Sequence, residues 1–238
     1  YIISHLSDDY NIIESPNGAD AVDKAINSQP DLIITDLMMP KMNGVEMSAI
    51  IKKDIRTSHI PVIMLTAKAM PSDMKEGYET GAADYITKPF RPSVLRARVQ
   101  NIIQAREKLK EIYGKKFSVE SQGVETTSLD EQFMQKLYNV LQENVANLEF
   151  NLESFSRDLG MSKASLYRKI KAITNLSPNE YIRNFRLEMG AKLLREAKLP
   201  VSDVYVAVGF SSIGYFSTCF KAYFGVSPTE YAGRDMKE

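Results

Sequence analysis

The 238-residue sequence has one cysteine, no long apolar run and no net charge. The single cysteine, Cys219, excludes an internal disulfide framework and is typical of a reducing compartment. No stretch approaches the roughly 18–20 uncharged apolar residues that span a bilayer, which excludes a membrane-spanning helix. Thirty basic residues balance thirty acidic ones, so the chain as a whole lacks the basic excess that usually accompanies nucleic-acid binding. A hydrophobic content of 44% argues against wholesale disorder.

The first residues are typical of a helix that is already under way. The chain opens at Tyr1, without the basic region or cleavage site that would mark a signal peptide. Ile2, Ile3 and Leu6 are spaced like the apolar face of a helix. We therefore expect the chain to begin inside a domain, as a fragment of a longer protein would.

The first 103 residues alternate short apolar runs with amphipathic stretches. The runs predict strands at residues 10–13, 32–36, 61–65 and 84–87. The stretches between them predict helices at residues 18–27, 44–53, 70–81 and 92–110. Apolar strands that alternate with helices are typical of a doubly wound α/β domain, in which helices cover both faces of a parallel sheet.

The rest of the chain changes character. Residues 111–127 are polar, which predicts a linker, and the pattern after Ser128 is helical throughout. This helical part contains an internal repeat, because residues 162–181 match residues 212–231 at seven of twenty positions. Asn175 corresponds to Gly225, and both residue types tolerate the left-handed conformation that ends a helix. The sequence therefore predicts a duplicated helical unit.

Three polar residues follow consecutive predicted strands of the first part. Asp36 and Thr66 end two of these strands, and Lys88 comes directly after the next one. Ligands of open α/β sheets gather outside the carboxyl ends of the strands. A carboxylate there can attack a phosphoryl group, while a hydroxyl and an ammonium group bind the transferred oxygens. The pattern predicts a phosphoryl-acceptor site.

These residues resemble the receiver domain of bacterial response regulators. The resemblance covers nearly all of residues 1–103 and rests on the segments DLIITDLMMPKMNG (31–44), LTA (65–67), GAADY (81–85) and KPF (88–90). It implies a flavodoxin-like fold in which Asp36 is the phospho-acceptor, Thr66 the switch hydroxyl and Lys88 the phosphate-binding lysine. It also implies that Tyr85 turns inward after phosphorylation, and that Asp36 and the backbone carbonyl of Met38 help to hold Mg²⁺.

The chain departs from this family at its start. The family's sheet begins with a strand that carries an acidic pair for Mg²⁺, and the sequence opens after that strand. Asp8 and Asp9 follow the first helix and do not replace the pair. Mg²⁺ favours several oxygen ligands in octahedral geometry, so Asp36 with Met38 makes an incomplete site and we expect poor phosphorylation of this chain. The resemblance also implies a cis peptide bond before Pro89.

The first copy of the repeat predicts a helix-turn-helix unit. A helix ends near Leu159, Gly160 makes the turn, and Ser162 caps the next helix. On that helix the apolar residues 166, 170 and 173 face inward, and the opposite face carries Lys163, Ala164, Tyr167, Arg168 and Lys171. Residues 159–179 contain four basic residues and no acidic residue, which favours DNA binding over an ordinary solvated face.

The second copy, residues 201–221, predicts a second unit of the same kind. Phe216 and Phe220 face inward, and the outward face carries Ile213, Gly214, Ser217, Thr218 and Lys221. Residues 179–196 between the units predict one helix, about 27 Å long at 1.5 Å per residue. This length is comparable to the roughly 34 Å between successive major-groove faces of DNA. Two groove-reading helices on a rigid spacer indicate a domain that binds double-stranded DNA.

Residues 128–234 resemble the AraC-type helix-turn-helix family. The resemblance rests on GMS (160–162), LYRKIK (166–171), RL (186–187), GF (209–210), YF (215–216), FK (220–221) and GVSP (225–228). It implies that the base-facing residues are Ala164, Tyr167, Arg168, Ile213, Gly214, Ser217 and Thr218. Thr218 and Gly214 depart from the strong-binder pattern, as does Tyr205 in place of a small alanine. We therefore expect the first unit to supply most specificity, with Arg168 on guanine, and the second unit to supply phosphate contacts.

The two resemblances together predict a two-component response regulator. Residues 1–110 are the expected receiver domain, 111–127 the linker and 128–238 the DNA-binding domain. Aspartyl phosphorylation by a histidine kinase would control sequence-specific DNA binding and transcription, with RNA polymerase as a partner and a homodimer as the assembly. The chain would act in the cytoplasm and would not be an enzyme. Residues 107–111 and the following spacer also resemble the C-terminal part of membrane-anchored hybrid sensor kinases.

Three alternatives stay open. A hydrolytic phosphatase would use Asp36 as its nucleophile, but no second carboxylate for acid–base catalysis follows it closely. A signalling adaptor would bind protein through the helical half, and a phosphorylation-independent regulator would bind DNA without the switch. Charge favours DNA, because residues 157–198 contain ten basic and four acidic residues. The neutral total of the chain therefore does not argue against nucleic acid.

Overall fold

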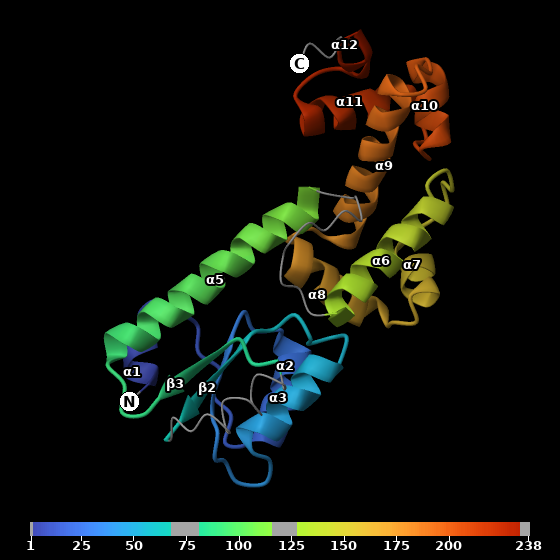
Figure 1. Ribbon diagram of the computed structural model, residues 1–238. Helices are drawn as coiled ribbons and strands as arrows, with labels where there is room; N and C mark the ends of the chain where they lie inside the picture. Colours follow the sequence, from blue (N-terminus) through green and yellow to red (C-terminus); the bar gives the residue numbers. More distant parts are fainter. Residues whose placement is uncertain (1, 68–80, 116–127, 234–238) are drawn as a thin grey trace. The chain divides into compact units, whose positions relative to one another are not determined.

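The computed structural model describes residues 2–67, 81–115 and 128–233. They form two compact units, each with its own buried core (Figure 1). The first unit comprises residues 2–67, 81–111 and 128–133. The second comprises residues 112–115 and 134–233.

Among the described residues, three parallel strands form the sheet of the first unit. Their spatial order is β1-β2-β3, and their bounds are Ile33–Asp36, Val62–Thr66 and Asp84–Thr87. Ile33 lies opposite Val62, and Ile63 lies opposite Asp84. Every residue of β2 is buried, as expected for a central strand with neighbours on both sides. The parallel sheet predicted from the sequence is confirmed.

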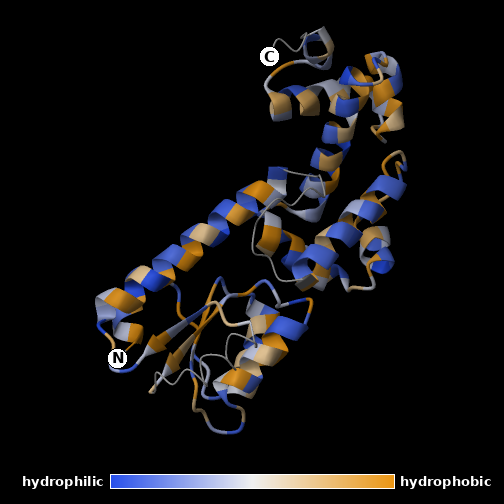
Figure 2. Ribbon diagram, viewed as in Figure 1, coloured by the Kyte–Doolittle hydropathy of each residue, from blue (hydrophilic) through white to orange (hydrophobic). Residues whose placement is uncertain are grey.

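Helices cover both faces of this sheet (Figure 1). Successive residues of a strand point to opposite faces. Val62 and Met64 of β2 accordingly pack with α2 and α3, whereas Ile63 and Leu65 pack with α1 and α5. Figure 2 shows apolar strands between helices that carry both apolar and polar bands. The bounds of these helices are Ile3–Leu6 for α1, Gly18–Ser28 for α2, Gly44–Lys53 for α3 and Pro92–Lys115 for α5.

Side chains of the sequence start α2 and α3. Asn17 accepts a hydrogen bond from the backbone N–H of Asp20 at 3.1 Å, which caps α2. Asn43 and Glu46 form a capping box at the start of α3. The N–H of Glu46 donates to Asn43 Oδ1 at 2.8 Å, and the N–H of Asn43 donates to Glu46 Oε2 at 3.1 Å. These caps explain why both helices begin near their predicted residues.

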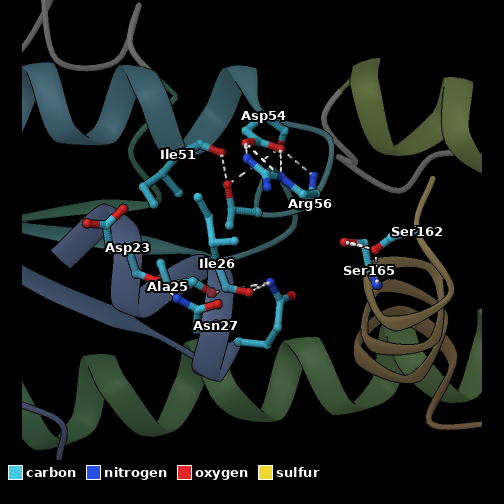
Figure 3. Close-up of polar contacts among 11 residues, drawn as sticks. Asp23, Ala25, Ile26, Asn27, Ile51, Asp54, Arg56, Ser162 and Ser165 are labelled. Carbon is cyan, nitrogen blue, oxygen red and sulfur yellow. Dashed lines mark hydrogen bonds and ion pairs between the residues drawn. The ribbon is translucent and has the colours of Figure 1, made fainter. Parts of the chain in front are cut away.

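The turn between α3 and β2 is also held by side chains (Figure 3). Arg56 Nε donates to both carboxylate oxygens of Asp54 at 3.0 Å, and this pairing raises the pKa of Arg56. Thr57 Oγ1 donates to the carbonyl oxygen of Ile51 at 2.8 Å inside the core. The turn therefore sets where β2 begins, and β2 carries Thr66 at its other end.

The strand predicted at residues 10–13 is wrong. No strand forms there, and 39% of Ile12 and 55% of Ile13 are exposed. A strand needs a neighbour that satisfies its backbone hydrogen bonds. In the part of the chain that the structure describes, only β1, β2 and β3 pair, and β1 pairs only with β2. The apolar residues of this segment are therefore not enough to make it a strand.

The other expectations for the first half have mixed outcomes. The Lys88–Pro89 peptide bond is cis. Helix α5 runs to Lys115, so residues 111–115 are helical where a linker was expected. Most of the helix predicted at residues 70–81 lies outside the described residues. Within the described ranges, every helix is too short or too polar to span a bilayer.

The described residues of the second unit form helices joined by loops, with no strand among them. Helix α9 is the spacer helix predicted at residues 179–196, and it packs against α8, α10, α11 and α12. Leu187 and Leu194 of α9 share a core with Phe216 and Phe220 of α11. The bounds are Ser128–Glu143 for α6, Leu152–Asp158 for α7, Lys163–Thr174 for α8, Pro178–Arg195 for α9, Val201–Ala207 for α10, Ile213–Phe224 for α11 and Pro228–Gly233 for α12.

Candidate phosphoryl-acceptor site and nucleic-acid interface

Asp36 and Lys88 meet at the carboxyl edge of the sheet. Asp36 is the last residue of β1, and Lys88 directly follows β3. The Lys88 ammonium group donates a hydrogen bond to the Asp36 carboxylate, and 42% of the Asp36 side chain stays exposed in this ion pair. An exposed carboxylate can reach a phosphoryl donor, and the adjacent ammonium group can bind the incoming oxygens. The predicted convergence of these two groups is confirmed.

Thr66 and Tyr85 lie on the neighbouring strands. In the register of β1 and β2, Thr66 lies one residue beyond the partner of Asp36. Its side chain is buried, and its carbonyl oxygen accepts a hydrogen bond from the N–H of Lys88 at 2.7 Å. Tyr85 lies opposite Met64 and packs, partly buried, with the core beneath α2 and α3. The switch roles of Thr66 and Tyr85 stay predictions.

The loop after Asp36 folds tightly against the backbone of β1. The N–H of Gly44 donates to the carbonyl oxygen of Leu37 at 3.0 Å. A Cβ atom at Gly44 would lie 2.4 Å from the carbonyl oxygen of Asp36, so this approach requires glycine. The N–H of Met38 lies 3.4 Å from Asp36 Oδ1. The start of α3 therefore helps to position the acceptor carboxylate.

Within the described residues, few oxygen ligands for Mg²⁺ surround Asp36. Mg²⁺ demands near-octahedral oxygen ligands. The Asp36 carboxylate is paired with Lys88, and the sequence assigned only the carbonyl of Met38 as a further ligand. The described part of the chain holds no group of three His, Cys, Asp or Glu side chains suited to a metal ion. Asp9, in the turn after α1, lies 3.6 Å from Arg96 Nε of α5.

The two helix-turn-helix units share one turn geometry. Gly160 follows α7 with a φ of +67°, and Gly209 follows α10 with a φ of +70°. In each turn the residue after the glycine donates its N–H to a carbonyl five residues earlier at 2.9 Å. This bond and the left-handed glycine end the helix and redirect the chain. The duplication inferred from the sequence is therefore present in the backbone.

The caps of the two recognition helices also correspond. Ser162 accepts a hydrogen bond from the N–H of Ser165 at 3.1 Å, and Ser212 accepts one from the N–H of Tyr215 at 3.2 Å. Ser162 Oγ lies 2.9 Å from Ser165 Oγ (Figure 3). Helix α8 ends at the left-handed Asn175, and α11 ends at the left-handed Gly225. A serine–glutamate capping box starts the helix that follows each of them: Ser177 with Glu180 for α9, and Ser227 with Glu230 for α12.

Helix α8 presents the predicted basic face. The apolar residues 166, 170 and 173 are buried, and the exposed or half-exposed residues include Lys163, Ala164, Tyr167, Arg168 and Lys171. Arg168 Nε donates to the carbonyl oxygen of Ala164 at 3.2 Å. Lys171 Nζ donates to the carbonyl oxygen of Asn175 at 2.7 Å. The recognition helix therefore carries cationic groups along its exposed side.

Lys169 does not belong to this face. Its side chain is fully buried, so one of the four basic residues counted in residues 159–179 adds no charge to the exposed surface. The spacing of residues in the sequence indicates that Lys169 lies on the buried side of α8. Lys169 follows Leu166 by three residues and precedes Ile173 by four, which places all three on one side of a helix.

Glu153 of α7 is a neighbour of the interface that sequence reasoning missed. Its carboxylate lies 2.9 Å from Lys163 Nζ, and both side chains are largely exposed. The hydrogen bond from Lys163 holds the pKa of Glu153 below its usual value. An exposed ion pair of this kind is weak. Lys163 can therefore exchange this carboxylate for a phosphate at little cost.

Helix α11 exposes the positions equivalent to the basic face of α8, but most of them carry uncharged residues. Ile213, Gly214, Thr218 and Lys221 are exposed and Ser217 is half-buried, while Phe216 and Phe220 are fully buried. A shift of fifty residues puts Ile213 in the place of Lys163 and Thr218 in the place of Arg168. The inward and outward assignments are confirmed. The outward face of α11 has one basic residue, Lys221.

Comparisons with known proteins match both halves of the chain. Residues 2–100 match the response regulator receiver domain, and residues 155–234 match a helix-turn-helix domain. Histidine kinase P4 of Formosa agariphila is 41% identical over 234 residues, which are 98% of this chain and 17% of that protein. The phosphate regulon transcriptional regulatory protein PhoB of Pseudomonas aeruginosa is 41% identical over 95 residues, which are 40% of this chain and 42% of that protein.

The chain spans less than half the length of these curated relatives. Among solved structures, the receiver domain of a signal transduction histidine kinase from Syntrophus aciditrophicus is 34% identical. It gives a TM-score of 0.42 over 44% of this chain and 80% of that chain. The chain described here carries a response regulator receiver domain followed by an AraC-type helix-turn-helix domain.

Proposed function

We propose that the chain is the output part of a two-component system, in which phosphorylation of Asp36 controls sequence-specific binding to double-stranded DNA and hence transcription. The observation that carries this proposal is the pair of equivalent recognition helices, α8 and α11. Each follows the same glycine turn and the same serine cap, and α8 has a basic exposed face. Duplex DNA as the partner implies action in the cytoplasm.

In the proposed input reaction, Asp36 accepts a phosphoryl group from a phosphohistidine. A carboxylate oxygen attacks phosphorus and the N–P bond breaks. The electron pair of that bond returns to the imidazole nitrogen, which takes up a proton from solvent. Lys88, already paired with the carboxylate, binds the phosphoryl oxygens, and the Thr66 hydroxyl donates to one of them. Tyr85 then turns inward and shifts a two-state equilibrium of the receiver.

The proposed partners follow from this chemistry. The phosphoryl donor is a histidine kinase, in the same polypeptide or in a separate one. The match of 98% of this chain to a protein named histidine kinase P4 supports the same polypeptide. Phosphorylated receivers would form a homodimer that places two DNA-binding domains on repeated sites, where they would engage RNA polymerase. Further oxygen ligands for Mg²⁺ would come from outside the described residues.

DNA binding is tested with the full chain and a non-specific duplex at increasing salt. We expect the association constant to fall steeply with salt, because each neutralised phosphate releases counterions. Lys171→Ala should weaken binding to all sequences and reduce the slope of log K against log salt by about 1. Lys24→Ala, on α2 of the receiver, should leave the slope unchanged. Salt-independent binding, or none, would favour the adaptor alternative.

The incomplete metal site gives a second prediction. The chain incubated with acetyl phosphate and Mg²⁺ should gain little or no phosphate by intact mass. The reason is that Asp36 is the only carboxylate among the residues assigned to the site, and Lys88 already engages it. Asp36→Asn, which lacks the acceptor carboxylate, is the negative control. Efficient gain of one phosphate by the unmodified chain, and not by Asp36→Asn, would show that this chain supplies enough Mg²⁺ ligands by itself.

A further inference from the structure

The outward face of α11 has few groups that can read a base by hydrogen bonding. The Thr218 hydroxyl donates to the carbonyl oxygen of Gly214 at 2.9 Å, so its hydrogen is used within the helix. Gly214 has no side chain, and Ser217 is half-buried. Lys221 is a point charge two turns from the start of the helix, which suits a phosphate better than a base edge. Polar readout by α11 is therefore weak.

Ile213 is the only large apolar side chain among the five residues assigned to the outward face of α11. It is the first residue of α11, directly after the Ser212 cap, and it is 45% exposed. The N-terminal residues of a recognition helix are those that contact base edges in the major groove. The place of Ile213 in the duplicated unit is that of Lys163 on α8, which belongs to the basic face. Its place at the start of the recognition helix therefore indicates that Ile213 faces the DNA.

Gly214 leaves room beside Ile213. A Cβ atom at Gly214 would meet nothing within 4 Å, so packing inside the protein does not require glycine there. The absent side chain lets a base edge approach the first turn of α11 closely. Residues 204–229 contain no acidic residue, so nothing in this segment repels the DNA backbone. The first turn of α11 therefore presents an exposed isoleucine within a segment that has no acidic residue.

The apolar group that the major groove offers is the 5-methyl group of thymine. We propose that α11 reads its half-site through van der Waals contact between Ile213 and a thymine 5-methyl group. The second unit then selects an A·T pair without a hydrogen bond to a base. This inference rests on the proposed DNA binding, and it gives the second unit a share in specificity beyond phosphate contacts.

The test removes the methyl group alone. The full chain selects sites from a random duplex library, and the enriched duplex is resynthesised with each thymine in turn replaced by deoxyuridine. Loss of one buried methyl contact should weaken binding by about three- to fivefold at one thymine. Ile213→Ala should bind the thymine and deoxyuridine versions of that duplex equally well. It should bind the thymine duplex about tenfold more weakly than the unmodified chain does.

Ile50→Ala is the matched control. Ile50 lies on α3 of the receiver, and its exposure of 41% is close to that of Ile213. This variant should keep the full sensitivity to deoxyuridine. Circular dichroism of Ile213→Ala should match that of the unmodified chain, because the side chain is exposed at a helix start.

The outcomes separate the inference from the function on which it rests. If the chain enriches a duplex but no thymine is sensitive, the methyl contact does not exist. If the sensitive thymine is equally sensitive in Ile213→Ala, another residue makes the contact and the assignment to Ile213 fails. If no duplex is enriched and none binds with salt dependence, the proposed DNA binding fails and the inference fails with it.

Discussion

Replacing Gly209 by alanine should lower the free energy of unfolding by about 2–4 kcal/mol. Gly209 has a φ of +70°, where any Cβ atom is strained, and the new Cβ would lie 2.4 Å from the carbonyl oxygen of Val145. The guanidinium group of Arg186 lies 3.1 Å from the same point and donates to the carbonyl oxygen of Asn147 at 2.5 Å. The alanine therefore has to displace a backbone carbonyl and a bonded arginine together.

The duplicated unit supplies a matched control for this effect. Gly160 makes the equivalent turn with a φ of +67°, but a Cβ atom there would meet nothing within 4 Å. Gly160→Ala should therefore cost only the backbone strain, about 1 kcal/mol. Urea unfolding followed by far-UV circular dichroism measures both changes. Equal losses for the two variants would show that the contact with Val145 does not restrict position 209.

Arg168→Ala should weaken binding to the selected DNA site by about 1–3 kcal/mol and relax the choice of base at one position. Arg168 lies on the exposed side of α8, and its Nε bonds to the carbonyl oxygen of Ala164 at 3.2 Å. This bond restrains the side chain along the helix. A planar guanidinium group held in this way can bind the O6 and N7 atoms of guanine together.

Two variants distinguish base reading from simple charge. Arg168→Lys keeps the charge but not the paired donors, so it should retain non-specific binding and still lose discrimination at that base pair. Thr218→Ala changes the equivalent residue of α11, whose hydroxyl already bonds to Gly214, and should change affinity by less than about twofold. Competition between the selected site and a scrambled duplex measures these effects. A larger loss for Thr218→Ala than for Arg168→Ala would reverse the ranking of the two units.

Much of the fold could be predicted because its signals are local. The bounds of α3 and β3 match the predicted ones, since an Asn–Glu capping box starts α3 and the strand-favouring residues Tyr85 and Ile86 lie at the centre of β3. The turn at Gly160 and the Ser162 cap were predicted from residue type alone. The convergence of Asp36 with Lys88 followed from the rule that parallel strands end at one edge.

The missed features depend on partners that lie far along the chain or on another element. Residues 10–13 have strand-like composition, but a strand forms only where another backbone accepts its hydrogen bonds. The pairing of Lys163 with Glu153 joins two helices, and the residue spacing within either helix does not predict it. The close approach of Gly209 to Val145 likewise depends on how a loop after α6 packs, which composition does not encode.

The sequence by itself determined the duplicated helical unit, the parallel α/β domain and the residues at each strand end, because repeats, periodicity and turn residues are properties of neighbouring positions. The tertiary structure decided which cations remain available at the surface. It buries Lys169 and pairs Lys163 with Glu153. The physical reason is that the charge a group presents depends on burial and on the nearest opposite charge, and both are set only when separate elements pack.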